Sequence, residues 1–147
     1  MVGPKKRFAL ADTAQQVVGG FLLAGPFVVT EEVWVLASHM EGWQGALTVL
    51  IVFLIGYGAL YKADDDRDPD YESEVAGIPA RFISLMLVAF GSVAILALVF
   101  DAPETFLAAT TYVDGAPTMR TVAITLKAVS VGAIFSVVGA ATADSVF

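Results

Sequence analysis

Four long apolar stretches are the feature of this chain that most restricts its fold. They cover about residues 16–37, 43–61, 81–100 and 120–142, and each is continuous rather than alternating. A helix needs about 20 mostly apolar residues to cross the ~30 Å hydrocarbon core of a bilayer, whereas a strand of a membrane barrel needs only about 10. The pattern therefore predicts an all-α fold. We expect residues 1–147 to form a single integral membrane domain, a four-helix transmembrane bundle made of two antiparallel hairpins.

The composition excludes several other classes of protein. Hydrophobic residues make up 57% of the chain and charged residues 16%, against roughly 45–50% and about 25% in soluble domains. The chain has no cysteine, and its single histidine, His39, cannot form a multi-histidine zinc site. The net charge of −7 disfavours nucleic acid, because phosphate binding uses clusters of Lys and Arg. We therefore expect no metal, no cofactor and no nucleic-acid partner.

The placement of the basic residues predicts how the chain crosses the membrane. Lys and Arg occur in the N-terminal tail and in the linker 62–80, whereas the other two linkers have none before Arg120. Basic loops stay on the cytoplasmic side of a membrane. Both termini and the linker 62–80 are therefore expected in the cytoplasm, with the protein in the plasma membrane. Trp34 and Trp43 flank the short outer turn, as aromatic residues do at membrane interfaces.

The linker 62–80 is strongly acidic and holds seven of the 15 acidic residues in the chain. The alternation of Asp64, Asp66 and Asp68 resembles the start of a calcium-binding loop. Pro69, however, stands where an EF-hand needs glycine. A solvated run of charge is therefore the favoured interpretation.

The linker between the third and fourth spans carries two local signals. Asp101 followed by Pro103 predicts the start of a short helix on the membrane surface. Asp114 and Gly115 form a dipeptide that is typical of a tight turn.

Three ionisable residues fall within the apolar stretches. Glu31 and Glu32 are expected ~9 Å below the outer end of the first span, and Lys127 ~10 Å into the fourth. Charge at such a depth is costly, so one hypothesis is that Glu31 and Lys127 form an ion pair. Glu32 points about 100° away from Glu31 around the helix, so the two glutamates do not share a face. Three alternatives stay open. Lys127 reaches outward to the interface, the glutamates are protonated, or the first span ends early and leaves both glutamates in water.

Two further features concern the packing of the helices. A stripe of small residues recurs on one face of the fourth span, which allows another helix backbone to approach closely. Its neighbour is either a helix of the same chain or a second subunit, and the sequence leaves both open. Pro26 is expected to kink the first span. The stripe consists of Thr125, Ala128, Gly132, Ser136, Gly139 and Ala143.

Parts of the first and fourth spans carry a resemblance to known proteins. They are the segment 17–36, the tail 127–147 and, most strongly, Gly25, Pro26, Glu31, Glu32 and Trp34. These parts resemble a family of integral membrane proteins of unknown function, found in halophilic archaea and some bacteria, and the likeness covers most of the chain. It brings no catalytic motif, so it implies a location in the membrane and no activity.

Two classes of function fit these observations. The first is a structural or accessory membrane module that assembles with itself or with other membrane proteins. The second is a small proton-coupled transporter in which Glu31 or Glu32 cycles a proton, although a paired Lys127 would hold the acid ionised and hinder that cycle. An enzyme is disfavoured because the spans contain no intramembrane His, no Cys and no paired aspartates.

Overall fold

The computed structural model describes residues 10–62, 74–75 and 77–146, and this part of the chain is almost entirely helical. The all-α prediction is confirmed. The acidic run at 64–72 and the basic cluster at 5–7 lie outside the described residues. A hairpin of β1 (Glu74–Val75) and β2 (Ile78–Pro79) precedes the third long helix. The helices are α1 (Leu10–Val28), α2 (Glu31–His39), α3 (Gly42–Tyr57) with the π-helical turn η1 (Gly58–Lys62), α4 (Ala80–Val99), α5 (Ala102–Thr111) and α6 (Met119–Val146).

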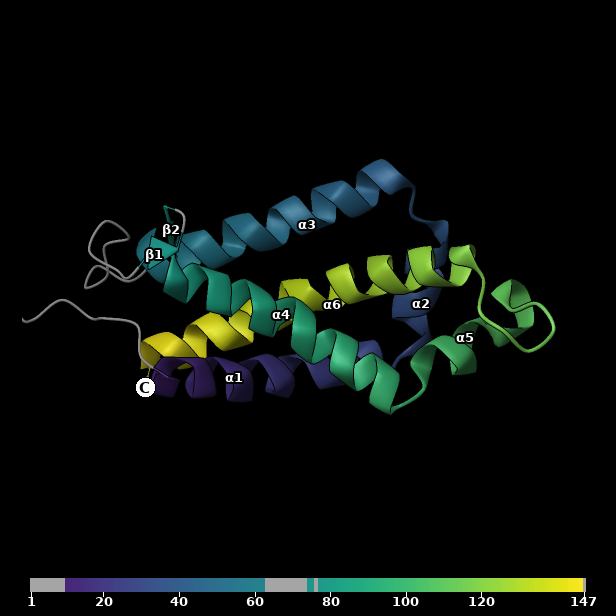
Figure 1. The fold of residues 1–147 in the computed structure, drawn as a ribbon, viewed down its shortest axis with the longest axis horizontal. Helices are drawn as coiled ribbons and strands as arrows, with labels where there is room; N and C mark the ends of the chain where they lie inside the picture. The colour runs from purple at the N-terminus through teal and green to yellow at the C-terminus, as the bar shows by residue number, and fades with distance from the viewer. Residues whose placement is uncertain (1–9, 63–73, 76, 147) are drawn as a thin grey trace, which may run out of the picture.

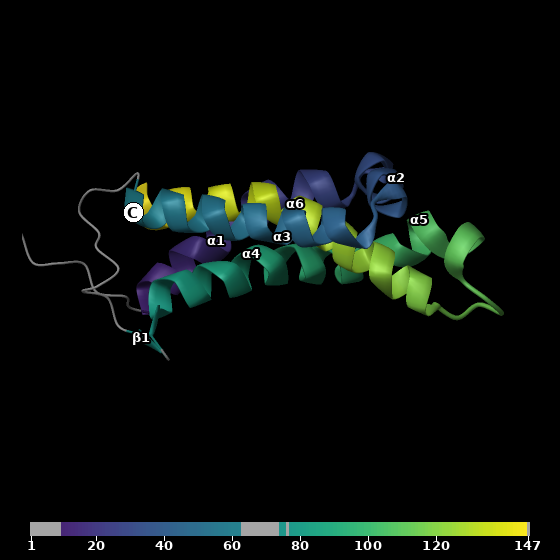
Figure 2. The same ribbon diagram turned by 90° about the horizontal axis from the view of Figure 1, so that it is seen from above.

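Four long helices run along the length of the molecule in alternating directions (Figure 1). α1 and α4 run away from the end that holds the C-terminus, and α3 and α6 run back toward it. The view from above places α2 and α5 at the opposite end (Figure 2). Within the described residues three helices are long and apolar enough to cross a membrane: Gly42–Tyr61, Ala80–Val99 and Met119–Ser145. The bent pair of α1 and α2 makes a fourth if it counts as one span.

The first predicted span, residues 16–37, is not a single helix. α1 ends at Val28, and the direction of the chain changes by 79° before α2 begins. Thr30 Oγ1 donates to the Phe27 carbonyl at 2.8 Å, and Trp34 Nε1 donates to the Val28 carbonyl at 2.9 Å. The Phe27 carbonyl also accepts from the Thr30 amide at 3.3 Å, and the indole of Trp34 gives the Val28 carbonyl a donor at the end of α1. These bonds stabilise the break. Pro26 lies in the last turn of α1, and the sharp bend comes after it.

The other predicted boundaries agree closely with the structure. Residues 43–61 correspond to α3 and η1, and residues 81–100 correspond to α4. Residues 120–142 correspond to α6, which continues for about one more turn. The expected surface helix after Asp101 is α5, and the expected turn at Asp114 is present, with positive φ at Asp114 and Gly115.

α6 is the central helix of the structure, because it contacts α1, α3 and α4. Its fully buried residues include Ala128, Ala133 and Ala140, whose small side chains let three neighbours pack around it. The predicted hairpin between the first two spans is not formed. α1 packs mainly on α6 and α4, whereas α3 packs mainly on α6. The reason is α2, which packs against α6 and separates α1 from α3 along the chain.

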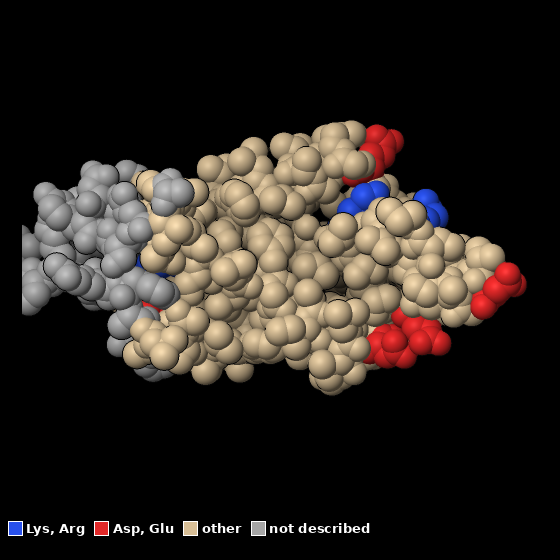
Figure 3. Space-filling model, in the orientation of Figure 1, with Lys and Arg blue, Asp and Glu red and all other residues tan. Residues whose placement is uncertain are grey.

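The charged side chains lie at the two ends of the long helices. Figure 3 shows Lys, Arg, Asp and Glu near the ends of the molecule and none on the face between them. Exposed apolar side chains cover the long helices, and Leu54, Leu87 and Leu98 are each more than three-fifths exposed. An uncharged apolar surface of this kind suits the hydrocarbon of a bilayer.

Candidate functional site

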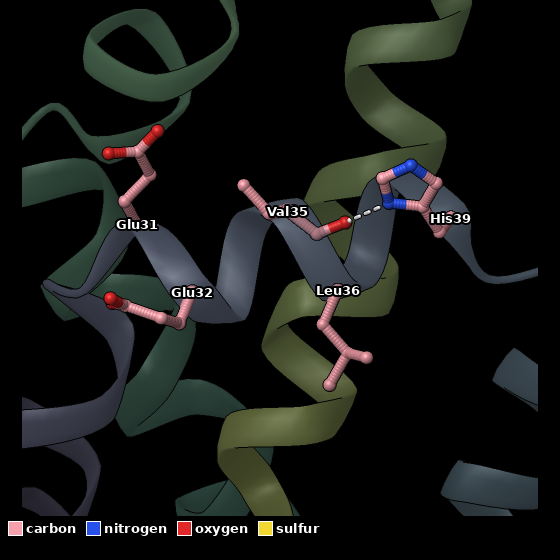
Figure 4. A pocket seen from close by; sticks show the side chains of 5 residues that line it. All are labelled: Glu31, Glu32, Val35, Leu36 and His39. Carbon is pink, nitrogen blue, oxygen red and sulfur yellow. Dashed lines mark hydrogen bonds between the residues drawn. The ribbon is translucent and has the colours of Figure 1, made fainter.

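Glu31 and Glu32 form the first turn of α2, and both are exposed. Figure 4 shows the two carboxylates pointing in different directions from the same turn. Negative charge is favourable at a helix N-terminus, where it interacts with the positive end of the helix dipole. α1 therefore ends before the two glutamates, which begin a separate helix.

Lys127 does not contact either glutamate. Its Nζ donates a hydrogen bond to the Met40 carbonyl at 2.6 Å, and no ion pair joins it to Glu31 or Glu32 within the described part of the chain. Met40 is the C-cap of α2, where a cation interacts favourably with the helix dipole. The predicted pair assumed one straight helix through residues 16–37, and the bend before α2 removes that geometry.

A shallow hollow of about 480 Å³ lies against the exposed side of α2. Its lining combines Glu31, Glu32 and His39 with two apolar residues, Val35 and Leu36 (Figure 4). His39 Nδ1 lies 2.9 Å from the Val35 carbonyl, which only accepts, so Nδ1 carries the proton in this bond. Among the described residues no group of three or more His, Cys, Asp and Glu side chains is arranged to hold a metal ion.

The small-residue stripe of α6 packs against helices of the same chain. Gly139 lies directly against the backbone carbonyl of Gly19 in α1, and a methyl group at either position would overlap the other backbone. Gly132 faces Val93 of α4, and a Cβ added there would meet the valine at 2.7 Å. Ala128 and Ala143 are also buried, and Thr125 is half-buried. Most of the stripe is therefore occupied within one subunit.

Ser136 forms the polar centre of that stripe. Its Oγ donates to the Gly20 carbonyl at 3.1 Å and lies 2.8 Å from Ser92 Oγ. A hydroxyl has one proton, so when Ser136 donates to Gly20 it accepts from Ser92. One hydrogen-bonded chain thus joins α1, α4 and α6 about halfway along their length.

A buried cation lies at the end of the molecule that holds the C-terminus. Arg81 begins the first turn of α4, and its side chain is 1% exposed. Its Nη1 donates to Asp144 Oδ1 at 2.6 Å, and its Nη2 donates to Asp12 Oδ2 at 3.1 Å. Asp144 comes from the end of α6 and Asp12 from the start of α1. One guanidinium group therefore connects three helices.

Gln16 extends this cluster toward the middle of α1. Its Nε2 donates to Asp144 Oδ2 at 3.2 Å, and its Oε1 accepts from Ser84 Oγ at 2.7 Å. Thr13 Oγ1 lies 3.0 Å from the same serine hydroxyl. We call the six side chains the Arg81 cluster. They are Asp12, Thr13, Gln16, Arg81, Ser84 and Asp144.

The sequence analysis did not predict the Arg81 cluster, because it used the basic residues only to assign the sides of the membrane and did not pair them with acids of other spans. The sequence nevertheless contains a signal for this cluster. Asp12 and Gln16 are four residues apart, which places them on one face of a helix. Arg81 and Asp144 stand at the ends of two spans that were expected to meet the membrane on the same side.

The comparison with protein families agrees with this architecture. The model of the family described as "Putative integral membrane protein (DUF2391)" matches residues 4–144. The chain belongs to this family. No curated protein and no solved structure matches the chain. This DUF2391 protein is therefore an integral membrane protein, and the family description assigns it no activity.

In the described part of the DUF2391 chain, charged residues form one group at each end of the long helices. The Arg81 cluster is buried and connects α1, α4 and α6 at one end. Glu31, Glu32 and Lys127 belong to the other end, where the acids are exposed and the lysine caps α2. The first region can hold helices together. The second presents charge at the surface of the molecule.

Proposed function

We propose that this DUF2391 protein is a structural or accessory module of the plasma membrane, which assembles with itself or with other membrane proteins. The Arg81 cluster is the observation that carries this proposal. It joins three helices through a buried guanidinium group, and removing that group would break the ion pairs of both Asp12 and Asp144. Helices held together in this way suit a stable scaffold better than the rocking motion of a transporter.

The proposal includes four membrane crossings. α1 has 19 residues, so by itself it reaches ~28 Å, close to the thickness of the hydrocarbon core. α2 is then not needed to complete the first crossing. It lies at the outer surface with its two glutamates exposed, which avoids the cost of placing their charge in lipid.

Both termini are proposed to lie in the cytoplasm. Asp12, Arg81 and Asp144 meet in one cluster, so the start of α1, the start of α4 and the end of α6 share one side of the membrane. The basic residues at 5–7, 62 and 67 are close in sequence to that same end. The positive-inside rule assigns this end to the cytoplasm.

The alternative function, a small proton-coupled transporter, has one observation in its favour. The first span is broken, and broken spans form the substrate sites of many transporters. The carboxylates at this break are exposed on α2 rather than directed between the long helices. This placement supports the accessory module, because a proton carrier within the membrane would have its acid inside the bundle.

Cysteine labelling tests the crossings and their orientation. The natural chain has no cysteine, so a single introduced thiol gives an unambiguous signal. Asp114→Cys should react with a membrane-impermeant maleimide in intact cells, because the linker after α5 is proposed to lie outside. Asp70→Cys should react only after the membrane is permeabilised. The reverse pattern would overturn the orientation, and equal labelling in intact cells would overturn the number of crossings.

The accessory role is tested by the oligomeric state and by flux. Native mass spectrometry of the protein in detergent should show a defined oligomer, or a defined complex when the protein is purified from its own membranes. Proteoliposomes should show no proton flux with the natural protein or with Glu31→Gln. Flux that the natural protein supports and Glu31→Gln abolishes would establish the transporter instead.

A further inference from the structure

A crevice separates α3 from α6 near the outer end of the molecule. It measures about 160 Å³ and is lined by Gly45, Ala46 and Val49 from α3 and by Leu126, Lys127 and Ser130 from α6. Figure 3 shows the surface hollowed beneath the outer end of α3, beside a patch of Lys and Arg atoms. A hollow of about 150 Å³ accepts an apolar group of the size of benzene. This crevice is therefore large enough for part of one hydrocarbon chain.

In the proposed membrane crossings, the charged end of Lys127 lies at the level where lipid headgroups begin. Its Nζ bonds to Met40, two residues before α3 begins, and α3 is the start of a 20-residue span. Trp43 stands beside this level and is 60% exposed, as expected for an aromatic residue at the interface. The lysine stem follows the apolar crevice while its charge reaches the polar boundary of the membrane.

Lys127 lines the crevice, and a second cation, Arg120, lies nearer the start of α6. Arg120 and Lys127 are seven residues apart, which is almost two helical turns, so they share a face of the helix. Arg120 is exposed. The ammonium group of Lys127 has three donors, and among the described residues it uses one of them, on Met40. Donors on both side chains are therefore available to an anion at this position.

We propose that Arg120 and Lys127 hold the phosphate of an anionic phospholipid, with an acyl chain of that lipid in the crevice between α3 and α6. The proposal rests on the membrane crossings of α3 and α6 described above. Charge complementarity selects the headgroup, because a phosphate accepts hydrogen bonds from both cations. The apolar lining below Lys127 selects a ligand with a hydrocarbon tail over a free ion.

The neighbouring acid does not compete for the two cations. Glu41 follows Met40, but its Oε2 accepts a hydrogen bond from Trp43 Nε1 at 2.9 Å, and its side chain also caps the start of α3. Gly45 adds space on the opposite wall, because a Cβ built there would lie 3.5 Å from Lys127 Cγ in ordinary contact. A larger side chain at Gly45 would fill the crevice without changing any charge.

The test measures lipid binding by native mass spectrometry of the delipidated protein in detergent. The probes are phosphatidylglycerol, phosphatidylcholine and inorganic phosphate. The natural protein should bind one phosphatidylglycerol at least tenfold more tightly than phosphatidylcholine, and inorganic phosphate should not displace it at equal concentration. Equal binding of the two lipids would overturn the assignment of the headgroup. Displacement by inorganic phosphate at equal concentration would overturn the role of the hydrocarbon chain.

Three variants localise the binding. Arg120→Gln removes an exposed charge, Lys127→Met removes the inner cation, and Gly45→Leu fills the crevice. Each should weaken phosphatidylglycerol binding at least fivefold. Lys6→Met makes the same change in net charge elsewhere and should alter binding less than twofold. An equal effect of Lys6→Met and Arg120→Gln would overturn the site, whereas the proposed orientation and accessory role are tested separately by labelling and flux.

Discussion

Arg81 and Asp144 form a buried ion pair of 2.6 Å between residues that are 63 positions apart in the chain. The aspartate lies near the end of α6 and the arginine at the start of α4, and both side chains are at most 1% exposed. Asp12 adds a second carboxylate from α1 at 3.1 Å. Three segments that are distant in sequence are thus held together at a single point.

Removing the cation should destabilise the protein strongly. Arg81→Met removes the guanidinium group that pairs with the buried Asp144 carboxylate, so we expect the free energy of unfolding to fall by about 3–5 kcal/mol. Thermal or denaturant unfolding in detergent measures this loss. Arg120→Gln removes an exposed positive charge and serves as the control, with an expected change below about 0.5 kcal/mol.

A double-mutant cycle separates the ion pair from the other contacts of each residue. The combination of Arg81→Met and Asp144→Asn should cost clearly less than the sum of the two single changes, because the second change removes the charge that the first leaves unpaired. Losses that add completely would show that the two side chains are not coupled.

The close approach of α1 and α6 should tolerate no added methyl group. In Gly139→Ala the new Cβ overlaps the Gly19 carbonyl, and backbone cannot move as a flexible side chain does. We expect a loss of about 1–3 kcal/mol in unfolding free energy. Gly91→Ala is the matched control, because no atom lies within 4 Å of its added Cβ. That variant should be unchanged or more stable by up to ~1 kcal/mol.

The break in the first span should depend on one indole hydrogen bond. Trp34 is 1% exposed, and its Nε1 donates to the Val28 carbonyl. Trp34→Phe keeps an aromatic ring but leaves this carbonyl without its donor, which should cost about 1–3 kcal/mol. Trp43→Phe, at a residue that is 60% exposed, should cost much less. Equal losses in thermal unfolding would contradict the role of Trp34 at the break.

Glu31 and Lys127 should behave independently. Lys127 bonds to Met40 rather than to a glutamate, so the effects of Glu31→Gln and Lys127→Met on unfolding free energy should add within about 0.5 kcal/mol. A coupling above that limit, measured with the two single variants and the double variant in detergent, would restore the ion pair that the sequence first indicated.

The sequence analysis located the second, third and fourth spans because continuous apolar runs of sufficient length are a direct signal of helices in lipid. It left an early end of the first span as one of three alternatives and did not place the break at Thr30, because the surrounding run stays apolar on both sides. Yet Thr30 followed by Glu31 and Glu32 is itself typical of a helix N-terminus, with a capping residue and acids in the first turn. Reading these acids as a helix start would have separated α1 from α2.

The polar contacts were harder to predict than the spans. The depth of Glu31 was measured along a straight first span, and the 79° bend between α1 and α2 leaves Met40, rather than Glu31, as the partner of Lys127. The Arg81 cluster depends on which helix ends meet. The distribution of Lys and Arg predicts the side of the membrane on which a helix end lies, but it does not predict which other helix ends lie next to it. The small-residue stripe predicted that another helix packs closely on α6. It did not predict which helix this is, and the structure shows that Gly139 contacts Gly19 of the same chain.

The lengths of the helices shape how the protein presents itself to its surroundings. α6 has 28 residues, or ~42 Å, whereas the candidate span Gly42–Tyr61 has 20 residues, or ~30 Å. In the proposed orientation the part of α6 that exceeds the length of the shorter span extends beyond the lipid on the outer side. α5 lies next to it, also outside the lipid. A molecule arriving from outside the cell would therefore contact α5 and the outer end of α6 before it reached any part of the protein within the membrane.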